Sequence, residues 1–183
     1  MKIDGKSLSL QDIWDVAHAP PGSLDVELSA PARTKVRIAR QFILKKLKGK
    51  EAIYGVNTGF GLLSNVRVST DKLDELQENL IRSHSVGLGQ PLSEPETRAI
   101  LLLRANALAS GHSGVSEQLI DALLAMLNAG VHPVIPEQGS VGACGDLAPL
   151  AHMSLTLIGE GEATFEGRVM DSAAALKKAR LKP

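Results

Sequence analysis

The chain has 183 residues, with 20 lysines and arginines against 20 aspartates and glutamates, so its formal net charge is zero. This balance, without a long basic stretch, argues against a nucleic-acid-binding protein. No apolar run approaches the roughly 18 residues that a membrane span needs, so we expect no membrane partner either. The hydrophobic content of 44% with only 3% aromatic residues indicates a core of aliphatic side chains that suit helices.

One cysteine and five histidines limit the redox and metal chemistry of the chain. Cys144 cannot form an internal disulfide, and the residues after Met1 lack the apolar stretch of a signal peptide, so we expect a cytoplasmic protein. The histidines show neither an HExxH pattern nor a pairing with cysteines, so no metal site is predicted. No repeat or linker divides the chain, which predicts a single domain over residues 1–183.

The first two predicted helices lie before residue 50. Ser9 can cap a short helix that ends near the prolines at 20–21. A longer helix is predicted over residues 31–48, and Gly49 closes it. The apolar side of this helix, read from its periodicity, consists of Val36, Ile38, Phe42, Ile43 and Leu47.

Residues 52–61, with the sequence AIYGVNTGFG, show neither helical nor strand periodicity. Their three glycines predict a loop whose backbone can approach a ligand closely. Tyr54, Asn57 and Thr58 place a phenol, an amide and a hydroxyl on this loop. Composition alone leaves a plain surface connector as the alternative.

The next predicted helix begins at Thr70 or Asp71 and delivers Ser83 and His84 at its C-terminal end, before Gly87. The dipole of a helix favours a histidine at this end. His84 can therefore be a structural residue or a binding residue.

A capping box over residues 93–96 opens a helix that is predicted to reach Gly111. Apolar residues cover most of its circumference, which predicts deep burial. If they are buried, Arg104 and Asn106 each need a hydrogen-bonding or ionic partner, and the sequence does not identify one.

The remaining elements are shorter. Ser116 caps a helix that stops at Gly130, and prolines then predict an extended segment. Residues 164–170 predict a small β-hairpin around Glu166-Gly167, and a last helix is predicted over residues 173–179.

Residues 139–152, GSVGACGDLAPLAH, combine three glycines with a predicted helix start, in which Asp146 is the cap and Pro149 lies in the first turn. A helix N-terminus beneath such a turn supplies oriented amides, which favour an anion or an electrophile. A glycine-rich capping turn without further function is the structural alternative. His152 is predicted to be a structural helix histidine.

This loop and the YGVNTGFG stretch resemble motifs of the aromatic amino acid ammonia-lyases and aminomutases, and the likeness extends over the whole chain in family order. In that family an Ala-Ser-Gly tripeptide forms an electrophilic 4-methylidene-imidazol-5-one group autocatalytically. The matching residues are Ala143, Cys144 and Gly145, with cysteine in place of serine. The resemblance implies an all-α, L-aspartase-like fold and a homotetramer, with the predicted hairpin near the C-terminus of this chain.

The resemblance also implies roles for the candidate site residues. Tyr54 matches the proposed catalytic base, and Asp146 matches the acidic residue beside the prosthetic group. Ser83-His84 followed by glycines resembles the histidine-using members, which implies non-oxidative loss of ammonia from L-histidine to give urocanate. The expected substrate-binding residues are Ser83, His84, Asn57 and Gly61.

The chain departs from the family pattern in two ways. Cyclisation uses the Gly145 nitrogen and the Ala143 carbonyl, so Cys144 changes only the later elimination, which would expel sulfide in place of water. Family members are also more than twice as long. We therefore expect an N-terminal portion, truncated before the central helical bundle, with little or no lyase activity by itself.

Other functions stay open at this point. A tyrosine- or phenylalanine-using lyase or aminomutase would carry similar motifs, and a catalytically silent domain would only fold or oligomerise. A Cys144 nucleophile with His84 or His152 as base is a further option. That option needs an exposed thiolate beside an imidazole, and no sequence signature of such an enzyme is present.

Overall fold

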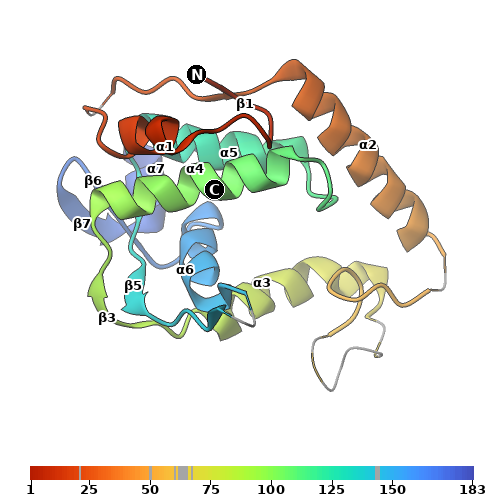
Figure 1. The fold of residues 1–183 in the computed structure, drawn as a ribbon. Coiled ribbons are helices and arrows are strands. Elements are labelled where there is room, and N and C mark those ends of the chain that lie inside the picture. Colours follow the sequence, from red (N-terminus) through yellow and green to blue (C-terminus); the bar gives the residue numbers. More distant parts are fainter. Residues whose placement is uncertain (21, 50, 60, 62–65, 67, 143–144) are drawn as a thin grey trace.

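A computed structural model of the chain describes residues 1–20, 22–49, 51–59, 61, 66, 68–142 and 145–183 (Figure 1). The chain is mainly helical, as the sequence predicts. Its helices are α1 (Leu10–Ala17), α2 (Ala30–Leu47), α3 (Leu73–His84), α4 (Glu94–Ala109), α5 (Glu117–Ala129), α6 (Leu147–Leu157) and α7 (Ser172–Lys178), and a 3-10 turn, Thr70–Lys72, precedes α3.

Short strands form three small sheets in the described part of the chain. β1 (Lys2–Ile3) and β2 (Glu27–Leu28) are parallel, β3 (Leu88–Pro91) and β5 (Pro136–Gln138) are antiparallel, and the third sheet has the order β4 (His132–Pro133), β6 (Glu162–Phe165), β7 (Arg168–Asp171). The strands β6 and β7 are the predicted hairpin. Its turn residues Glu166 and Gly167 have φ values of 50° and 70°, the two positive values of a type I′ turn.

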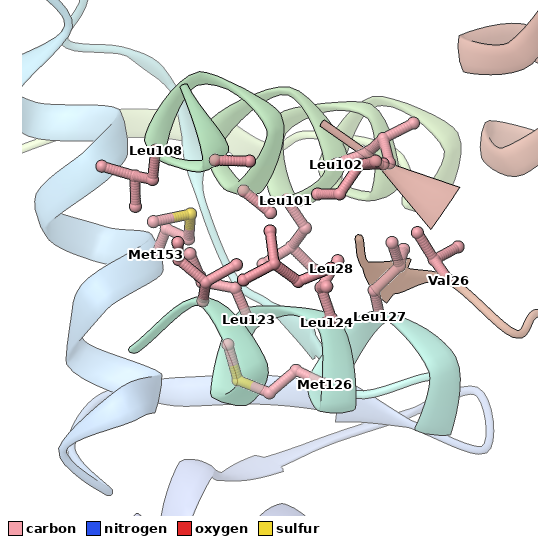
Figure 2. Close-up of a cluster of buried hydrophobic side chains, with 14 of the residues drawn as sticks. Val26, Leu28, Leu101, Leu102, Leu108, Leu123, Leu124, Met126, Leu127 and Met153 are labelled. Carbon is pink, nitrogen blue, oxygen red and sulfur yellow. The ribbon is translucent and has the colours of Figure 1, made fainter. Parts of the chain in front are cut away.

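The hydrophobic core lies between α4 and α5 (Figure 2). These helices turn leucines toward each other, Leu28 of β2 lies among them, and Met153 reaches in from α6. Met126 points to the other side of α5, toward the C-terminal strands. Each fully buried leucine contributes about 1.5–3 kcal/mol relative to exposure. The α4–α5 pair therefore forms the centre of the core, against which other elements pack.

Helix α4 confirms the predicted capping box and corrects the predicted burial. The Glu96 carboxylate accepts the Ser93 N–H at 2.8 Å, and Asn106 Oδ1 accepts the Gly5 N–H at 2.9 Å. The helix is not buried on all sides, because Leu103 is 46% exposed and Arg104 is exposed next to it. One stripe of α4 therefore faces away from the core.

Buried Arg98 joins α4 to the end of α1 and to β4. Its guanidinium donates to the Ala19 carbonyl at 2.7 Å and to His132 Nε2 at 3.1 Å, and lies 3.6 Å from Glu94. His132 Nε2 accepts this bond, so the proton of the neutral ring is on Nδ1. Burial lowers the pKa of His132, the Glu94 carboxylate opposes this, and the Arg98 charge adds to the lowering.

Helix α2 extends away from the rest of the chain in Figure 1. Arg33 makes a bidentate pair with Asp121 of α5 at 2.7 and 2.8 Å, and Arg37 Nε lies 2.6 Å from Glu117. These pairs set the rotation of the helix. The predicted apolar side is wrong at Ile38 and Phe42, which are 61% and 59% exposed.

Two glycines form the contact on which α2 rests. A Cβ on Gly111 would lie 2.8 Å from Lys35 Cβ, and a Cβ on Gly114 would lie 2.5 Å from Ile43 Cγ1. Both glycines have positive φ, 79° and 69°. They form the glycine notch in the α4–α5 turn, and no side chain fits there without moving α2.

Candidate active site

A hollow of about 680 Å³ lies where the end of α3, the start of α6 and the exposed stripe of α4 meet the loop of Tyr54. Its walls combine apolar side chains with a few polar groups, which is typical of small-molecule sites. The lining residues are Tyr54, Gly61, Leu80, Ile81, His84, Arg104, Gly145, Asp146, Leu147, Leu150, Ala151 and Ser154. The hollow therefore brings together five of the sequence-predicted site residues: Tyr54, Gly61, His84, Gly145 and Asp146.

The pairing of β3 with β5 brings two of these walls together. β3 follows the end of α3, and β5 precedes the glycine-rich loop that leads into α6. Helix α3 also packs against α6. His84 and the residues that precede α6 thus meet although about 60 residues separate them in the chain.

His84 lies at the last position of α3, with its side chain half buried in the wall of the hollow. Its Nδ1 is 2.9 Å from the Leu80 carbonyl, which can only accept, so Nδ1 carries the proton of the neutral ring. The Nε2 lone pair is then available to an N–H donor in the hollow. Ser83 does not line the hollow, and its hydroxyl donates to the same Leu80 carbonyl at 2.9 Å.

The loop of Tyr54 is held by an internal side-chain bridge. Buried Asn57 accepts the Ile53 N–H at 2.7 Å and donates to the Glu51 carbonyl at 3.0 Å. Its amide is therefore used within the loop, and Asn57 is not among the lining residues. Tyr54, by contrast, is 61% exposed and faces the hollow.

The glycine-rich loop approaches the hollow at Gly145 and Asp146. Gly145 has a φ of 79°, and its N–H donates to the Gly142 carbonyl at 3.2 Å. Asp146 occupies the predicted cap position of α6, but its carboxylate accepts from the Ser140 hydroxyl rather than from the helix. The predicted prosthetic-group residues Ala143 and Cys144 lie outside the described residues.

His152, on α6, bonds to the turn that follows α3. The Gly87 N–H donates to its Nε2 at 3.0 Å, so Nε2 carries the lone pair and the ring is neutral. Burial lowers the pKa of His152. This bond agrees with the predicted structural role, and it occupies the lone pair that His152 would need as the base for a thiol.

Arg104 lines the hollow, although sequence reasoning assigned it no functional role. Within the described part of the chain, no acceptor lies within hydrogen-bonding distance of its guanidinium and no carboxylate pairs with it. Partial burial among the walls lowers its pKa, although the group stays protonated at neutral pH. The sequence feature that could have pointed to Arg104 is its positive charge on a helix whose other residues are mostly apolar.

The described chain contains no cluster of three or more histidine, cysteine, aspartate or glutamate side chains that could hold a metal ion. None of its helices is long and apolar enough to cross a membrane.

Comparisons with known proteins place the chain in a family. The family described as aromatic amino acid lyase matches residues 8–183. The probable histidine ammonia-lyase of Thermoplasma volcanium is 51% identical over 185 residues, which cover 100% of this chain and 36% of that protein. The histidine ammonia-lyase of Trypanosoma cruzi superposes with a TM-score of 0.90 at 36% identity, over 100% of this chain and 34% of the other.

The ergothioneine-degrading enzyme ergothionase of Treponema denticola gives a TM-score of 0.94 at 36% identity, over 100% of this chain and 36% of that one. The chain spans about a third of the length of these relatives. The family match covers nearly all of the sequence and includes every residue of the hollow. The chain belongs to the aromatic amino acid lyase family.

Proposed function

We propose that the chain is the N-terminal part of a histidine ammonia-lyase, a carbon–nitrogen lyase that eliminates ammonia from L-histidine to give urocanate. The observation that carries this proposal is the hollow that joins Tyr54, His84, Gly145 and Asp146. Its volume of about 680 Å³ is in the usual range of small-molecule sites. The names of relatives about 50% identical to this chain support histidine as the substrate.

Ala143, Cys144 and Gly145 would form the methylidene-imidazolone group, and the described residues around them fit such a loop. Gly145 has a conformation that other residues rarely adopt, and a Cβ on either Gly142 or Gly145 would meet nothing within 4 Å. Cyclisation would join the Gly145 nitrogen to the Ala143 carbonyl carbon with loss of water. Elimination would then remove the Cα proton of Cys144 and break its Cβ–Sγ bond, with release of hydrogen sulfide. The group would supply an electrophile that activates the substrate amino group for departure.

The other residues of the hollow bind the substrate and move its proton. Tyr54 is the base that removes the β-proton, because its phenol faces the hollow from a loop. His84 accepts the N–H of the substrate imidazole through Nε2, the nitrogen that its Leu80 bond leaves free. Ser83 and Asn57 act indirectly: Ser83 shares the Leu80 carbonyl, and Asn57 holds the loop of Tyr54. Gly61 leaves room in the wall beside Tyr54.

Residues 1–183 would form the N-terminal domain that precedes a central helical bundle, in an enzyme that assembles as a homotetramer in the cytoplasm. Exposed apolar side chains on several elements support a larger assembly. Ile38, Phe42, Leu103 and Leu147 are between 46% and 61% exposed. Surfaces of this kind are typically covered by another part of a protein.

The intact mass of the purified chain tests the prosthetic group directly. We expect a species lighter by one water and one hydrogen sulfide than the sequence mass, with no thiol that an alkylating reagent can label. A full sequence mass with an alkylatable Cys144 would contradict formation of the group in this chain.

Activity tests the substrate. The chain should be inactive alone and should release urocanate from L-histidine when it is extended by the C-terminal two thirds of a relative. In that extended enzyme, Tyr54→Phe should lower kcat by about 10²–10⁴-fold, the usual range for loss of a general base. His112→Gln, at an exposed histidine, is the matched control and should retain activity.

The exposed apolar surfaces also favour a second candidate, a catalytically silent domain that only folds or oligomerises. This candidate predicts no ammonia release from any amino acid by the extended protein. Release from tyrosine or phenylalanine in preference to histidine would instead support the tyrosine- or phenylalanine-using members, including the aminomutases.

A further inference from the structure

Two backbone segments that lead to residues of the hollow touch at Gly87 and Gly139, without side chains between them. A Cβ on Gly139 would lie 3.2 Å from Gly87 Cα and 3.0 Å from Ala148 Cβ. A Cβ on Gly87 would lie 3.1 Å from His152 Nε2 and 3.1 Å from Pro136 Cβ. We call Gly87, Gly139, Ala148 and His152 the glycine junction. Its tight packing means that none of these segments can shift alone.

The residues of the glycine junction lie close in the chain to the functional residues of the hollow. Gly87 follows His84 by three residues, and Gly139 begins the loop that ends at Asp146. His152 belongs to α6, the helix that starts at that loop. Its bond to the Gly87 N–H is the polar link across the junction, and it is 3.0 Å long.

Resting on the proposed function, we propose that His152 is a positioning residue of the lyase site. By accepting the Gly87 N–H, its neutral ring fixes the turn that directly follows His84 against the helix that follows the prosthetic-group loop. His152 itself does not line the hollow. It acts through the backbone, and its protonation state decides whether the link exists.

The link exists only while the ring is neutral, because a protonated Nε2 is a donor and would face the Gly87 N–H as a second donor. The elements packed against α6 carry these titratable groups: Asp74, Glu75, Glu78, Arg82 and His84 on α3, Glu137 on β5, His132 on β4, Glu162 on β6, and Lys177 and Lys178 on α7. Burial is the cause of the lowered pKa of His152, and none of these groups offsets it. Because this pKa lies below its ordinary value, the ring is neutral at pH 7 and the link is lost only at a more acidic pH.

Nuclear magnetic resonance on the isotope-labelled 183-residue chain tests the proposal without any activity. At pH 7, the ring nitrogens of His152 should report the neutral form with the proton on Nδ1. As the pH falls through its pKa, the Gly87 amide and the His84 ring should shift with the same midpoint as the His152 ring. A cationic ring or an Nε2–H form at pH 7, or a Gly87 amide indifferent to this titration, would overturn the proposal.

Variants separate positioning from packing. In His152→Leu the Gly87 amide should exchange with solvent about three- to tenfold faster, as expected for loss of one hydrogen bond, and the His84 ring signals should move. In His152→Gln a neutral acceptor remains, so slow exchange should return and the pH dependence should disappear. His112→Gln should match the wild type in both readouts. If His152→Leu does not fold, the wild-type titration and His152→Gln still decide the question.

These outcomes are independent of the proposed reaction. Wild-type exchange and unchanged His84 signals in His152→Leu would overturn the positioning role, whatever the enzyme does. Conversely, an extended enzyme that releases no ammonia while the Gly87 and His84 signals respond as expected would overturn the lyase function and leave the link through His152 standing.

Discussion

Helices α3 and α5 have similar lengths, 12 and 13 residues, and both are amphipathic, yet their apolar faces end up in different surroundings. Five residues of α5 are buried, and the helix packs against α4, β2 and α2. No residue of α3 is fully buried, and its half-buried Leu80 and Ile81 line the hollow. An apolar stripe thus identifies a helix and its inward side. It does not say whether that side meets a core or a cavity.

The two helices are therefore held in different ways. Helix α5 is held by packing. Helix α3 packs against α6. At its C-terminal end, the Arg82 guanidinium forms ion pairs with Glu160 at 2.6 Å and with Glu78 at 3.0 Å. The Glu160 carboxylate and then Glu78 raise the pKa of Arg82 above its usual value. An exposed ion pair at one end of α3 therefore adds to its packing on α6.

The largest expected effect tests this contrast with one truncation on each helix. Leu123→Ala on α5, where the side chain is 1% exposed, should lower the free energy of unfolding by about 2–5 kcal/mol through lost burial and a cavity. Leu80→Ala on α3 should cost less than about 1 kcal/mol, because its side chain borders open space. Urea denaturation of both variants measures the difference. Equal losses of unfolding free energy in the two variants would contradict the conclusion that α5 turns its apolar face to the core and α3 turns its own to the hollow.

An effect of intermediate size on stability is expected from pH, through the buried ring of His132. The folded pKa of His132 is lowered, so the unfolded chain binds more protons below its ordinary pKa of about 6.5. The stability of the wild type should therefore fall as the pH drops below about 6.5, by at most about 1.4 kcal/mol per pH unit from this group.

His132→Gln keeps an acceptor for Arg98 without a titrating ring, and it should show a shallower fall between pH 6.5 and pH 5. His112→Gln should show the wild-type slope. The measurement is urea denaturation at several pH values. Identical slopes of unfolding free energy against pH in all three proteins would show that His132 does not contribute to the pH dependence.

The smallest global effect should come from the charge that fastens α3. The Arg82 and Glu160 side chains are 41% and 40% exposed, so Arg82→Gln should lower overall stability by less than about 1 kcal/mol. The α3 amides should nevertheless exchange faster than those of α5, because local opening no longer has to break the pair. Glu75→Gln, on the same helix, is the control. Unchanged exchange in α3 would show that packing on α6 alone holds it.

Most helix ends could be predicted because capping is local. Ser9, Ser93 and Ser116 each accept from a backbone amide three residues ahead, as their sequence positions predict. The rotation of α2 could not be predicted, because the helix carries two apolar stripes. Pairing of Arg33 and Arg37 with α5 selects the stripe that contains Val36. That choice depends on residues about 80 positions away.

The candidate site likewise has features that the sequence predicts and features that it does not. Tyr54, His84 and Asp146 stand in motifs, and the sequence placed them in one site through their resemblance to the family. The place of Arg104 in the wall and the link between Gly87 and His152 depend on tertiary packing. The sequence predicts a substrate-binding role for Asn57 but not the bonds of its amide to Ile53 and Glu51, because a sequence shows that a side chain is polar without showing which partner it has.

The glycine notch holds α2 at two points, Lys35 and Ile43. These residues lie about 12 Å apart along the helix, at 1.5 Å per residue. A tilt of about 5° around Lys35 would displace Ile43 by about 1 Å, which the close contact at Gly114 opposes. The chain continues from the end of α2 toward the loop of Tyr54. The absence of side chains at Gly111 and Gly114 thus fixes the direction in which α2 leads the chain toward that loop.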